Sequence, residues 1–194
     1  TLGSDGRLTF VPAPDYTGPA SFAYTITDDH GGIASSTVDI TVTPQNDPPV
    51  ASDDTRPVVE DTPVSGNVLG NDTDSDNNPL SVTSFEVGGV TYPAGTTVVL
   101  ASGTLTIAAD GSYTFTPAAN YNGAVPIVTY TASDGNGGTD TATLSLGPVT
   151  PVNDAPVSTP LAPASSADGQ TVTLDVASSF TDVDAGDTRT YSAT

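Results

Sequence analysis

Hydrophobic and polar residues alternate along most of the chain with a period of two, and no window has a convincing helical period of 3.6 residues. Period-two spacing is typical of β-strands that bury one face. Turn-forming pairs such as Asp110-Gly111 and Gly137-Gly138 separate the alternating stretches. The pattern predicts strands at residues 8–11, 20–27, 34–43, 80–87, 97–100, 103–108, 112–117, 125–133 and 139–147.

The same run of residues occurs twice. Residues 5–18 match residues 110–123 without a gap, at an offset of 105 positions (110 minus 5). Residues 43–50 match residues 150–157 at an offset of 107 (150 minus 43). A period of this length, holding about seven short strands, predicts an all-β Greek-key sandwich for each unit. A β-propeller blade would repeat at less than half this spacing.

Proline-bearing segments end each unit. Asn46-Asp47-Pro48-Pro49 and Asn153-Asp154-Ala155-Pro156 occupy equivalent places in the repeat. Proline fixes φ and cannot donate to a β-ladder, so these segments are expected to be linkers between domains. The sequence therefore predicts the C-terminal half of one repeat at residues 1–45, a complete repeat at 46–152 and the N-terminal half of a third at 153–194.

The charge is almost entirely negative. There are 23 acidic residues against 3 basic ones, and the formal net charge is -20, so nucleic acid and anionic lipid are poor partners. Every acidic residue except Glu60 and Glu86 is aspartate. Aspartate and asparagine suit tight turns and the oxygen cages that hold Ca²⁺. Bound divalent cations would relieve the repulsion between these charges.

Other classes of site are disfavoured. The chain has no cysteine and a single histidine, His30, so neither thiolate nor imidazole zinc sites can be built. No stretch approaches the roughly 20 apolar residues of a membrane span, so membrane insertion is not expected. Thr1 does not begin a signal sequence, and we expect the chain to be a soluble piece of something longer.

Three segments together resemble a known family. They are Asp110-Gly-Ser-Tyr-Thr-Phe-Thr-Pro-Ala-Ala-Asn-Tyr-Asn-Gly, Tyr130-Thr-Ala-Ser-Asp-Gly-Asn-Gly-Gly-Thr-Asp and Pro151-Val-Asn-Asp-Ala-Pro. They are similar to the cadherin-like, VCBS-type tandem repeats of bacterial RTX adhesins, and the match covers residues 1–154. Residues 155–194 look more like a dystroglycan-type cadherin-like repeat, through Ser178-Ser-Phe-Thr-Asp-Val-Asp-Ala-Gly-Asp and Tyr191-Ser-Ala-Thr.

The resemblance implies tandem Ig-like, cadherin-like β-sandwiches end to end, with Ca²⁺ at the domain junctions. It also implies secretion to the bacterial surface by a type I system. There the chain would serve as an extender between an anchor and distal ligand-binding domains, in cell adhesion and biofilm formation. One departure is that the glycine-rich nonapeptide array of these proteins is absent from the sequence.

Calcium takes six to eight oxygen ligands, so each site needs several carboxylates and amides from separate loops. Alternate residues of an extended run share one side, so Asp72, Asp74 and Asp76 are expected to converge. Glu60, in Val-Glu-Asp-Thr, resembles the early-strand glutamate of cadherins and would face the second junction. The ligands expected at the first junction are Asp15, Asn46, Asp47, Asp72, Asp74, Asp76 and Asp134. At the second they are Asn153, Asp154, Asp182, Asp184, Asp187 and Glu60, with Asn120 as the counterpart of Asp15.

These acidic residues also have interpretations other than a domain-junction calcium site. The run from Asp72 to Asp76 has the spacing of an EF-hand start, but Asn77 replaces the invariant glycine and no glutamate follows at loop position 12, so an EF-hand is rejected. A solvated acidic turn is the remaining alternative to a calcium site. No nucleophile and base pair stands out, so the chain is not expected to be an enzyme.

The expected function is mechanical. Ions shared between successive repeats of the same chain would remove hinge freedom and convert an acidic chain into a stiff spacer. One rival is an Ig-like module that binds a glycan or protein through its loops, and another is an accessory domain of a secreted enzyme. A further hypothesis is that residues 155–194 of one copy pair with residues 1–45 of the next, which would build a head-to-tail fibre by strand complementation. An arbitrary window cut from a longer protein would equally explain the incomplete halves.

Overall fold

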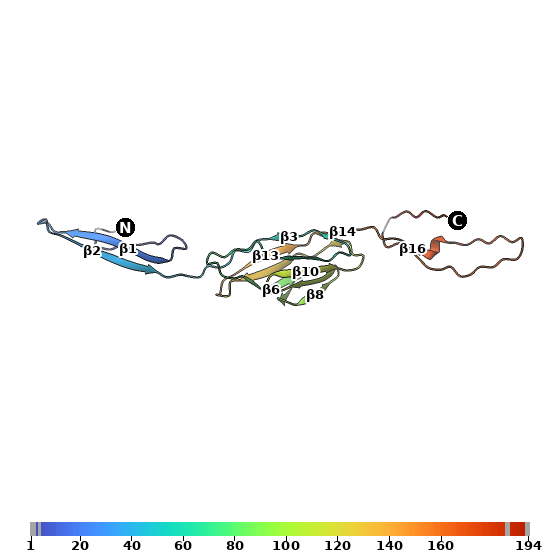
Figure 1. The fold of residues 1–194 in the computed structure, drawn as a ribbon, viewed down its shortest axis with the longest axis horizontal. Helices are drawn as coiled ribbons and strands as arrows, with labels where there is room; N and C mark the ends of the chain where they lie inside the picture. Colours follow the sequence, from blue (N-terminus) through green and yellow to red (C-terminus); the bar gives the residue numbers. More distant parts are fainter. Residues whose placement is uncertain (1–2, 4, 185–186, 193–194) are drawn as a thin grey trace.

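The computed structural model describes residues 3, 5–184 and 187–192 and has three parts in a row (Figure 1). A two-stranded ribbon comes first, a β-sandwich lies in the middle, and a loosely paired segment follows. No helix of the described residues is long and apolar enough to cross a membrane. Positions 185–186 and 193–194, which belong to the motifs noted for the third unit, lie outside the described residues.

The first part is an antiparallel ribbon of β1 (Gly18–Thr27) and β2 (Ile33–Val42). Both strands fall close to their predicted ranges, because alternation sets the pleat. The strand predicted at residues 8–11 is wrong, since only Leu8 forms a bridge there. The equivalent residues of the central sandwich lie in a strand that is paired on both sides, so neighbouring strands decide whether this segment forms one. Phe10 nevertheless packs on Phe22, with ring centroids 5.1 Å apart.

The central sandwich contains two main sheets. Four strands run in the order β5 (Val64–Asn67), β10 (Ser112–Pro117), β9 (Gly103–Ile107), β8 (Thr97–Leu100). Five run in the order β3 (Asp54–Thr55), β13 (Thr139–Ser145), β12 (Val128–Ser133), β6 (Ser81–Val87), β7 (Val90–Pro93). The all-β sandwich predicted from the spacing is confirmed.

The core lies between these two sheets. Leu105 and Phe115 from one sheet and Phe85, Tyr130 and Leu144 from the other are almost completely buried. Along β10 and β12 every second residue is buried, as strict alternation requires. Burial of a large apolar side chain contributes roughly 1.5–3 kcal/mol, so this layer is what makes the central sandwich a stable unit.

Short strands close the sandwich along its length. β3 pairs in parallel with β13, and β4 (Val58–Val59) pairs in parallel with β14 (Pro148–Thr150). β11 (Gly123–Ala124) pairs antiparallel with the other side of β14. These two- and three-residue strands were not predicted, because they are too short for a period to register.

The third part has few ladder bonds. β15 (Val157–Ser158) pairs with β16 (Phe180–Thr181), and a single 3₁₀ turn, η1 (Ala177–Ser179), precedes β16. The pairing Val157↔Thr181 repeats the bridge Val50↔Thr73 at the start of the central sandwich. The local conformation after each linker is therefore the same.

Ser102 offers a stability test within the core. Its side chain is 2% exposed, and its hydroxyl has no hydrogen-bond partner among the described residues. A buried hydroxyl without a partner costs about 1–3 kcal/mol. Ser102→Ala should therefore raise the stability of the central sandwich, by roughly 1 kcal/mol, in urea unfolding followed by tyrosine fluorescence. The exposed Ser65→Ala is the control, and a stability loss in Ser102→Ala would contradict this account.

Candidate metal centres at the two junctions

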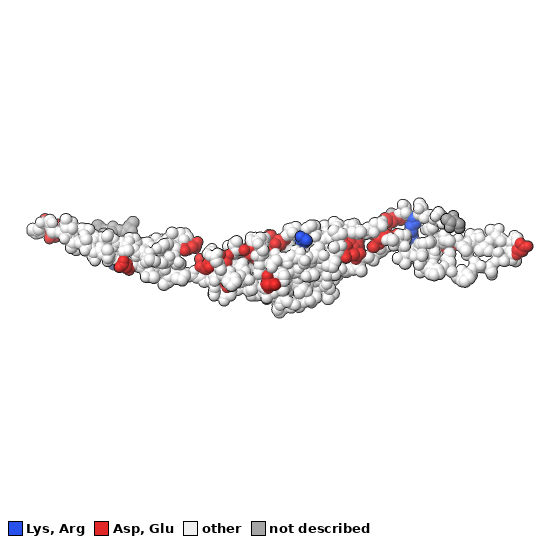
Figure 2. Space-filling model, in the orientation of Figure 1, with Lys and Arg blue, Asp and Glu red and all other residues white. Residues whose placement is uncertain are grey.

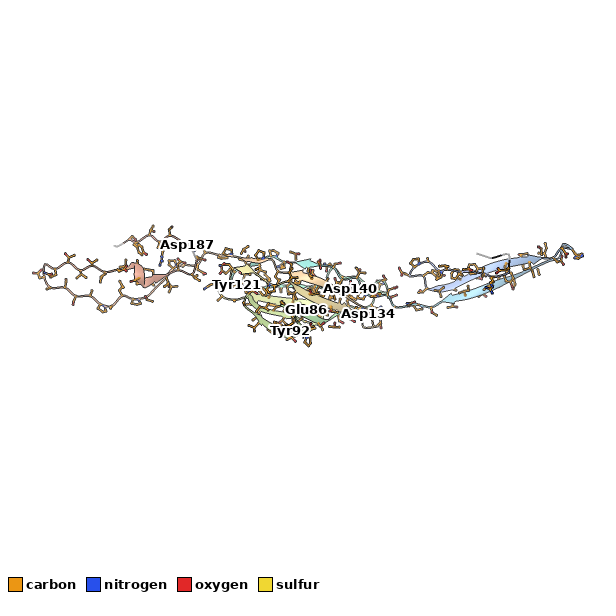
Figure 3. The ribbon with its side chains drawn as sticks, turned by 180° about the vertical axis from the view of Figure 1, so that it is seen from behind. Glu86, Tyr92, Tyr121, Asp134, Asp140 and Asp187 are labelled. Atoms are coloured by element: carbon orange, nitrogen blue, oxygen red, sulfur yellow. The ribbon has the colours of Figure 1, made fainter. Side chains whose placement is uncertain are left out.

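Acidic side chains gather where the central sandwich meets its neighbours (Figure 2). Figure 3 places Asp134 at the end facing the β1–β2 ribbon and Asp187 beyond the opposite end. The two ion pairs among the described residues, Arg7 with Asp5 and His30 with Asp29, are both exposed. The described junction carboxylates therefore have no salt-bridge partner from the protein's own cations.

At the first junction the linker is bound to the next unit by side chains. The backbone N–H of Asp47 donates to Asp76 Oδ2 at 2.8 Å, and Asn46 Nδ2 donates to Asp134 Oδ2 at 2.6 Å. Asn78 Nδ2 donates to Asn46 Oδ1 at 3.2 Å. Three elements far apart in sequence thus meet around the linker, as expected for a site between domains.

Asp74 and Asp134 are oriented by the turns that carry them. Asp74 Oδ1 accepts the N–H groups of Asp76 and Asn78 at 2.9 and 3.0 Å, which is an Asx turn. Its other oxygen, Oδ2, is buried and has no partner among the described residues. Asp134 is 3% exposed, and its Oδ1 accepts two further N–H bonds from Asn136 and Gly138. These bonds, with that of Asn46 the strongest, lower the pKa of Asp134.

Asp15 reaches the same junction from the preceding unit. Burial raises the pKa of Asp47, and the negative charges of Asp15, Asp76 and Asp74 raise it further. A carboxylate surrounded by like charges in a partly desolvated place is one that a divalent cation would stabilise. Five of the predicted side chains, those of Asp15, Asp47, Asp74, Asp76 and Asp134, are therefore grouped around the linker with Asn46.

The second junction repeats the arrangement of the first. The N–H of Asp154 donates to Asp184 Oδ2 at 2.6 Å, as that of Asp47 does to Asp76. The N–H of Asp184 donates to Asp182 Oδ1 at 3.1 Å, as that of Asp76 does to Asp74. Oδ2 of Asp154 is buried without a partner among the described residues. The same hydrogen bonds recur at both linkers, so the geometry belongs to the repeat.

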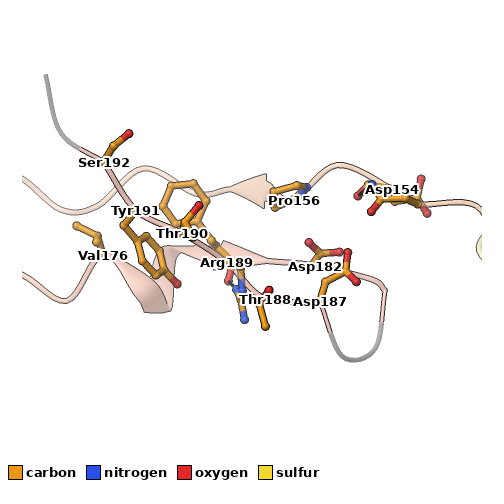
Figure 4. A pocket seen from close by; sticks show the side chains of 12 residues that line it. Asp154, Pro156, Val176, Asp182, Asp187, Thr188, Arg189, Thr190, Tyr191 and Ser192 are labelled. Carbon is orange, nitrogen blue, oxygen red and sulfur yellow. Dashed lines mark hydrogen bonds between the residues drawn. The ribbon is translucent and has the colours of Figure 1, made fainter.

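Three carboxylates at this junction come close to one another. Oxygens of Asp182, Asp184 and Asp187 all lie within 4.8 Å of each other. Figure 4 shows Asp182 beside Asp187, with Asp154 on the neighbouring linker segment, and all three line a pocket of about 740 Å³. In the same pocket Arg189 donates to the carbonyl of Phe180 at 2.6 Å. Carboxylate oxygens at such spacing fit a hard cation of the size of Ca²⁺.

The central sandwich contributes Glu60 to the second junction. Glu60 is 2% exposed, and its Oε2 accepts the N–H of Val152 at 2.9 Å. Burial raises the pKa of Asp154, and the charges of Asp184, Asp61, Glu60 and Asp182 raise it further. The expectation that Glu60 faces this junction agrees with that geometry.

Two residues at the junctions were not predicted from the sequence. Asp61 lies next to Glu60 and accepts the N–H of Asn120 at 3.0 Å, so it shares the pole with both. Asn78 binds Asn46 across the first junction. Asp61 is next to Glu60 in the sequence and Asn78 is close to Asp76, and this proximity to predicted ligands could have identified both residues. Asn120 itself is placed at the pole through its backbone, and Asn153 Nδ2 donates to the Asp154 carbonyl at 2.9 Å.

Asp72 makes its hydrogen bonds with the central sandwich. Its Oδ1 accepts the N–H of Ser52 at 2.9 Å, and both of its oxygens lie 3.0–3.1 Å from the Tyr130 hydroxyl. Asp76, in contrast, accepts the N–H of Asp47 from the linker, and the Asx turn at Asp74 orients the following residues. The role of Asp72 as a calcium ligand stays a prediction.

Comparisons with known proteins agree with this architecture. Residues 46–147 match the family described as bacterial Ig domain, and residues 1–43 match the cadherin-like domain. No curated protein matches the sequence. The solved structures that are similar include the endo-fucoidan hydrolases MfFcnA9 and MfFcnA4 from glycoside hydrolase family 107.

The likeness to the two hydrolases is limited. MfFcnA9 shares 14% identity over 72% of this chain with a TM-score of 0.31, and MfFcnA4 shares 15% over 76% with a TM-score of 0.35. The chain spans 23% and 22% of their respective lengths. Such a likeness carries no information on activity.

Proposed function

Because the chain belongs to the bacterial Ig domain family, we propose that it is a calcium-stiffened extracellular spacer. Bacterial Ig and cadherin-like domains are structural or adhesion-related modules, and cadherin-like domains typically bind calcium. The finer assignment, to the extender of an RTX adhesin active in cell adhesion and biofilm formation, rests on the sequence resemblance. The proposal assigns the chain no catalytic role.

One observation carries this proposal. At both linkers an aspartate N–H donates to a carboxylate of the following unit, and a buried carboxylate oxygen close to that bond has no partner within the part of the chain that the structure describes. Leaving a charged oxygen buried and unpaired is costly, and a shared cation would remove that cost. The residues that would hold Ca²⁺ are Asp15, Asn46, Asp47, Asp74, Asp76 and Asp134 at one junction. At the other they are Glu60, Asp61, Asp154, Asp182, Asp184 and Asp187.

The donor set favours calcium over other metals. Every candidate ligand presents oxygen, the sequence contains no cysteine, and His30 lies in the turn between β1 and β2, at the opposite end of the ribbon from the linker that follows Val42. Magnesium demands a small octahedral shell and keeps several waters, whereas calcium accepts many carboxylates in a flexible shell. Bound calcium would supply the positive charge that joins carboxylates of adjacent units, so hinge motion at the linker would be lost.

The proposal is tested by measuring shape with and without calcium. Small-angle X-ray scattering should give a longer maximum dimension of the chain in calcium than in EDTA. The calcium concentration is roughly 1 to 5 mM, which covers the extracellular range and above. The melting temperature should also fall by several degrees on chelation, because an ion that binds only the folded state stabilises it. Magnesium at equal ionic strength is the control. Identical scattering curves in calcium and in EDTA would refute the proposal.

A further inference from the structure

One side of the central sandwich ends in an open strand edge. The opposite side is closed by the short strands β3, β4, β11 and β14, which pair with one another and with β13. β8, in contrast, is the last strand of the four-stranded sheet, and β9 is its one partner among the described residues. An edge strand presents every second N–H and C=O away from its sheet. These backbone groups of β8 are therefore in position to pair with another strand.

The other edges of the two main sheets are protected, and the β8 edge is not. β3 carries Asp54, Pro63 stands directly before β5, and β7 ends in Pro93. Charges and prolines at an edge are the usual features that prevent a further strand from pairing there. β8 has the sequence Thr-Val-Val-Leu and contains neither feature. Its Val99 is 80% exposed, so an apolar side chain stands in solvent at an unprotected edge.

The surroundings of β8 contain no charge. From Val87 to Ala109 the sequence has no acidic or basic residue, although the whole chain carries a net charge of -20. On the face that Figure 2 shows, the tip of the projection that carries β8 in Figure 1 is white surface. Two copies of so acidic a chain repel each other wherever their carboxylates meet. The β8 edge is a place where they can approach without that repulsion.

The outer face of this sheet is uncharged up to the edge. Ser65, Thr114, Thr106 and Thr97 pair in one row across β5, β10, β9 and β8. The Oγ1 atoms of Thr97 and Thr106 lie 2.8 Å apart. Threonine and valine suit a pleated surface with strand neighbours on both sides. The row can therefore continue into a further strand of the same composition.

We propose that β8 is a self-association edge, at which β8 of one copy pairs antiparallel with β8 of a second copy. The two four-stranded sheets then form one continuous sheet of eight strands around a two-fold axis. The pleat restricts the register, because a shift by one residue would turn buried side chains outward. Val98, which is 5% exposed, lies opposite Val98 of the second copy, and Thr97 lies opposite Val99.

This pairing joins two spacers side by side. The strands of the sandwich run along the long axis of the molecule in Figure 1, so antiparallel pairing joins copies that point in opposite directions. Two strands of four residues bury less than the roughly 1,200 Å² of a stable complex, so the contact is transient. It uses none of the junction carboxylates and stands independently of the calcium proposal.

Sedimentation equilibrium of the full chain in EDTA, with roughly 150 mM salt to screen its charge, tests the contact. The wild type should pass from monomer towards dimer as its concentration rises to on the order of 1 mM. Val99→Lys places a charge at the edge and should raise the dissociation constant by roughly 10-fold or more. Ser65→Lys is the matched control, because Ser65 is exposed on the same face, three strands from β8, and it should dimerise like the wild type.

Both lysine variants should melt within about 3 °C of the wild type, since both positions are exposed. A wild type that stays monomeric over the whole range overturns the proposal. Dimerisation that both variants weaken equally also overturns it, because net charge would then be the cause. So does dimerisation that Val99→Lys leaves intact, as pairing of residues 155–194 with residues 1–45 would give.

The register is tested by disulfide cross-linking, because the chain has no cysteine of its own. Opposite residues of an antiparallel pair lie within disulfide reach. A mixture of Thr97→Cys and Val99→Cys chains in a glutathione buffer should therefore form a disulfide between copies at least several-fold faster than either variant alone. Equal rates in the mixture and in the separate variants, or no cross-link at all, overturn the antiparallel pairing of β8.

Discussion

Replacing Asp182 and Asp184 together with asparagine is expected to weaken calcium binding at the second junction by on the order of 100-fold. The two carboxylates lie in one cluster with Asp187, and Asp184 also receives the N–H of Asp154 from the linker. Losing two charges from one site lowers its affinity for a divalent cation far more than losing a distant charge, because calcium affinity follows the number of charged ligands. Isothermal titration with calcium measures the loss.

The control variant has the same net charge as the variant that lacks the Asp182 and Asp184 carboxylates. Asp29 lies in the turn between β1 and β2, Asp168 lies in a turn between β15 and η1, and both are exposed, so Asp29→Asn with Asp168→Asn removes two charges outside the two clusters. That variant should bind calcium like the wild type. Asp74→Asn with Asp76→Asn should in turn weaken the first junction and spare the second. Unchanged calcium affinity in the Asp182 and Asp184 variant would show that the second junction does not hold the ion.

The second large effect concerns the backbone of the central sandwich. Gly103 begins β9 with φ +145°, and a Cβ built there would approach the Thr116 carbonyl oxygen and the Cα of Pro117. Gly103→Ala should therefore lower the free energy of unfolding by about 3 kcal/mol or more, since backbone strain and overpacking add at one position. Urea unfolding of the central sandwich measures this loss.

Gly89→Ala provides the matched comparison. Gly89 also has a positive φ, +80°, but nothing lies within 4 Å of a Cβ at that position. It should cost only about 1 kcal/mol, the ordinary penalty of a left-handed conformation. Equal losses in the two variants would mean that the contact with β10 contributes nothing, contrary to the crowded geometry at Gly103.

Much of the architecture could be read from the chain. The alternation along residues 97–100 and 112–117 predicted β8 and β10 with their observed bounds. The longer strands form as predicted because each buries every second residue, and this burial is what alternation in the sequence indicates. The prediction failed at residues 8–11, although the equivalent residues 113–116 lie in β10, which also ends in a proline and is paired with β5 and β9 on its two sides. The neighbouring strands, and not the local alternation, therefore decide whether this segment forms a strand. Strands of two or three residues, such as β3 and β4, are set by the partner strand and leave no period.

The candidate sites divide in the same way. The repeated pair Asn46-Asp47 and Asn153-Asp154 pointed to both junctions, and the grouping of Asp74, Asp76 and Asp134 around the first linker agrees with that reading. Their role as calcium ligands stays a prediction, as do the proposed domain boundaries. Asp72 was grouped with them from its spacing, which gives no sign of its contacts with Ser52 and Tyr130. Asp61 was missed because its role depends on Asn120, 59 residues away.

The sequence by itself determined the all-β class, the repeat, the linkers and the abundance of aspartate, because these follow from local periodicity, proline and composition. Only the tertiary structure decided which carboxylates meet. Asp182, Asp184 and Asp187 lie close in the chain and stay together, whereas Asn46 and Asp134 are 88 positions apart and meet only in the fold, through a hydrogen bond of 2.6 Å. Electrostatic interaction depends on separation in space and on the water excluded between the groups, and neither quantity is written in the order of the residues.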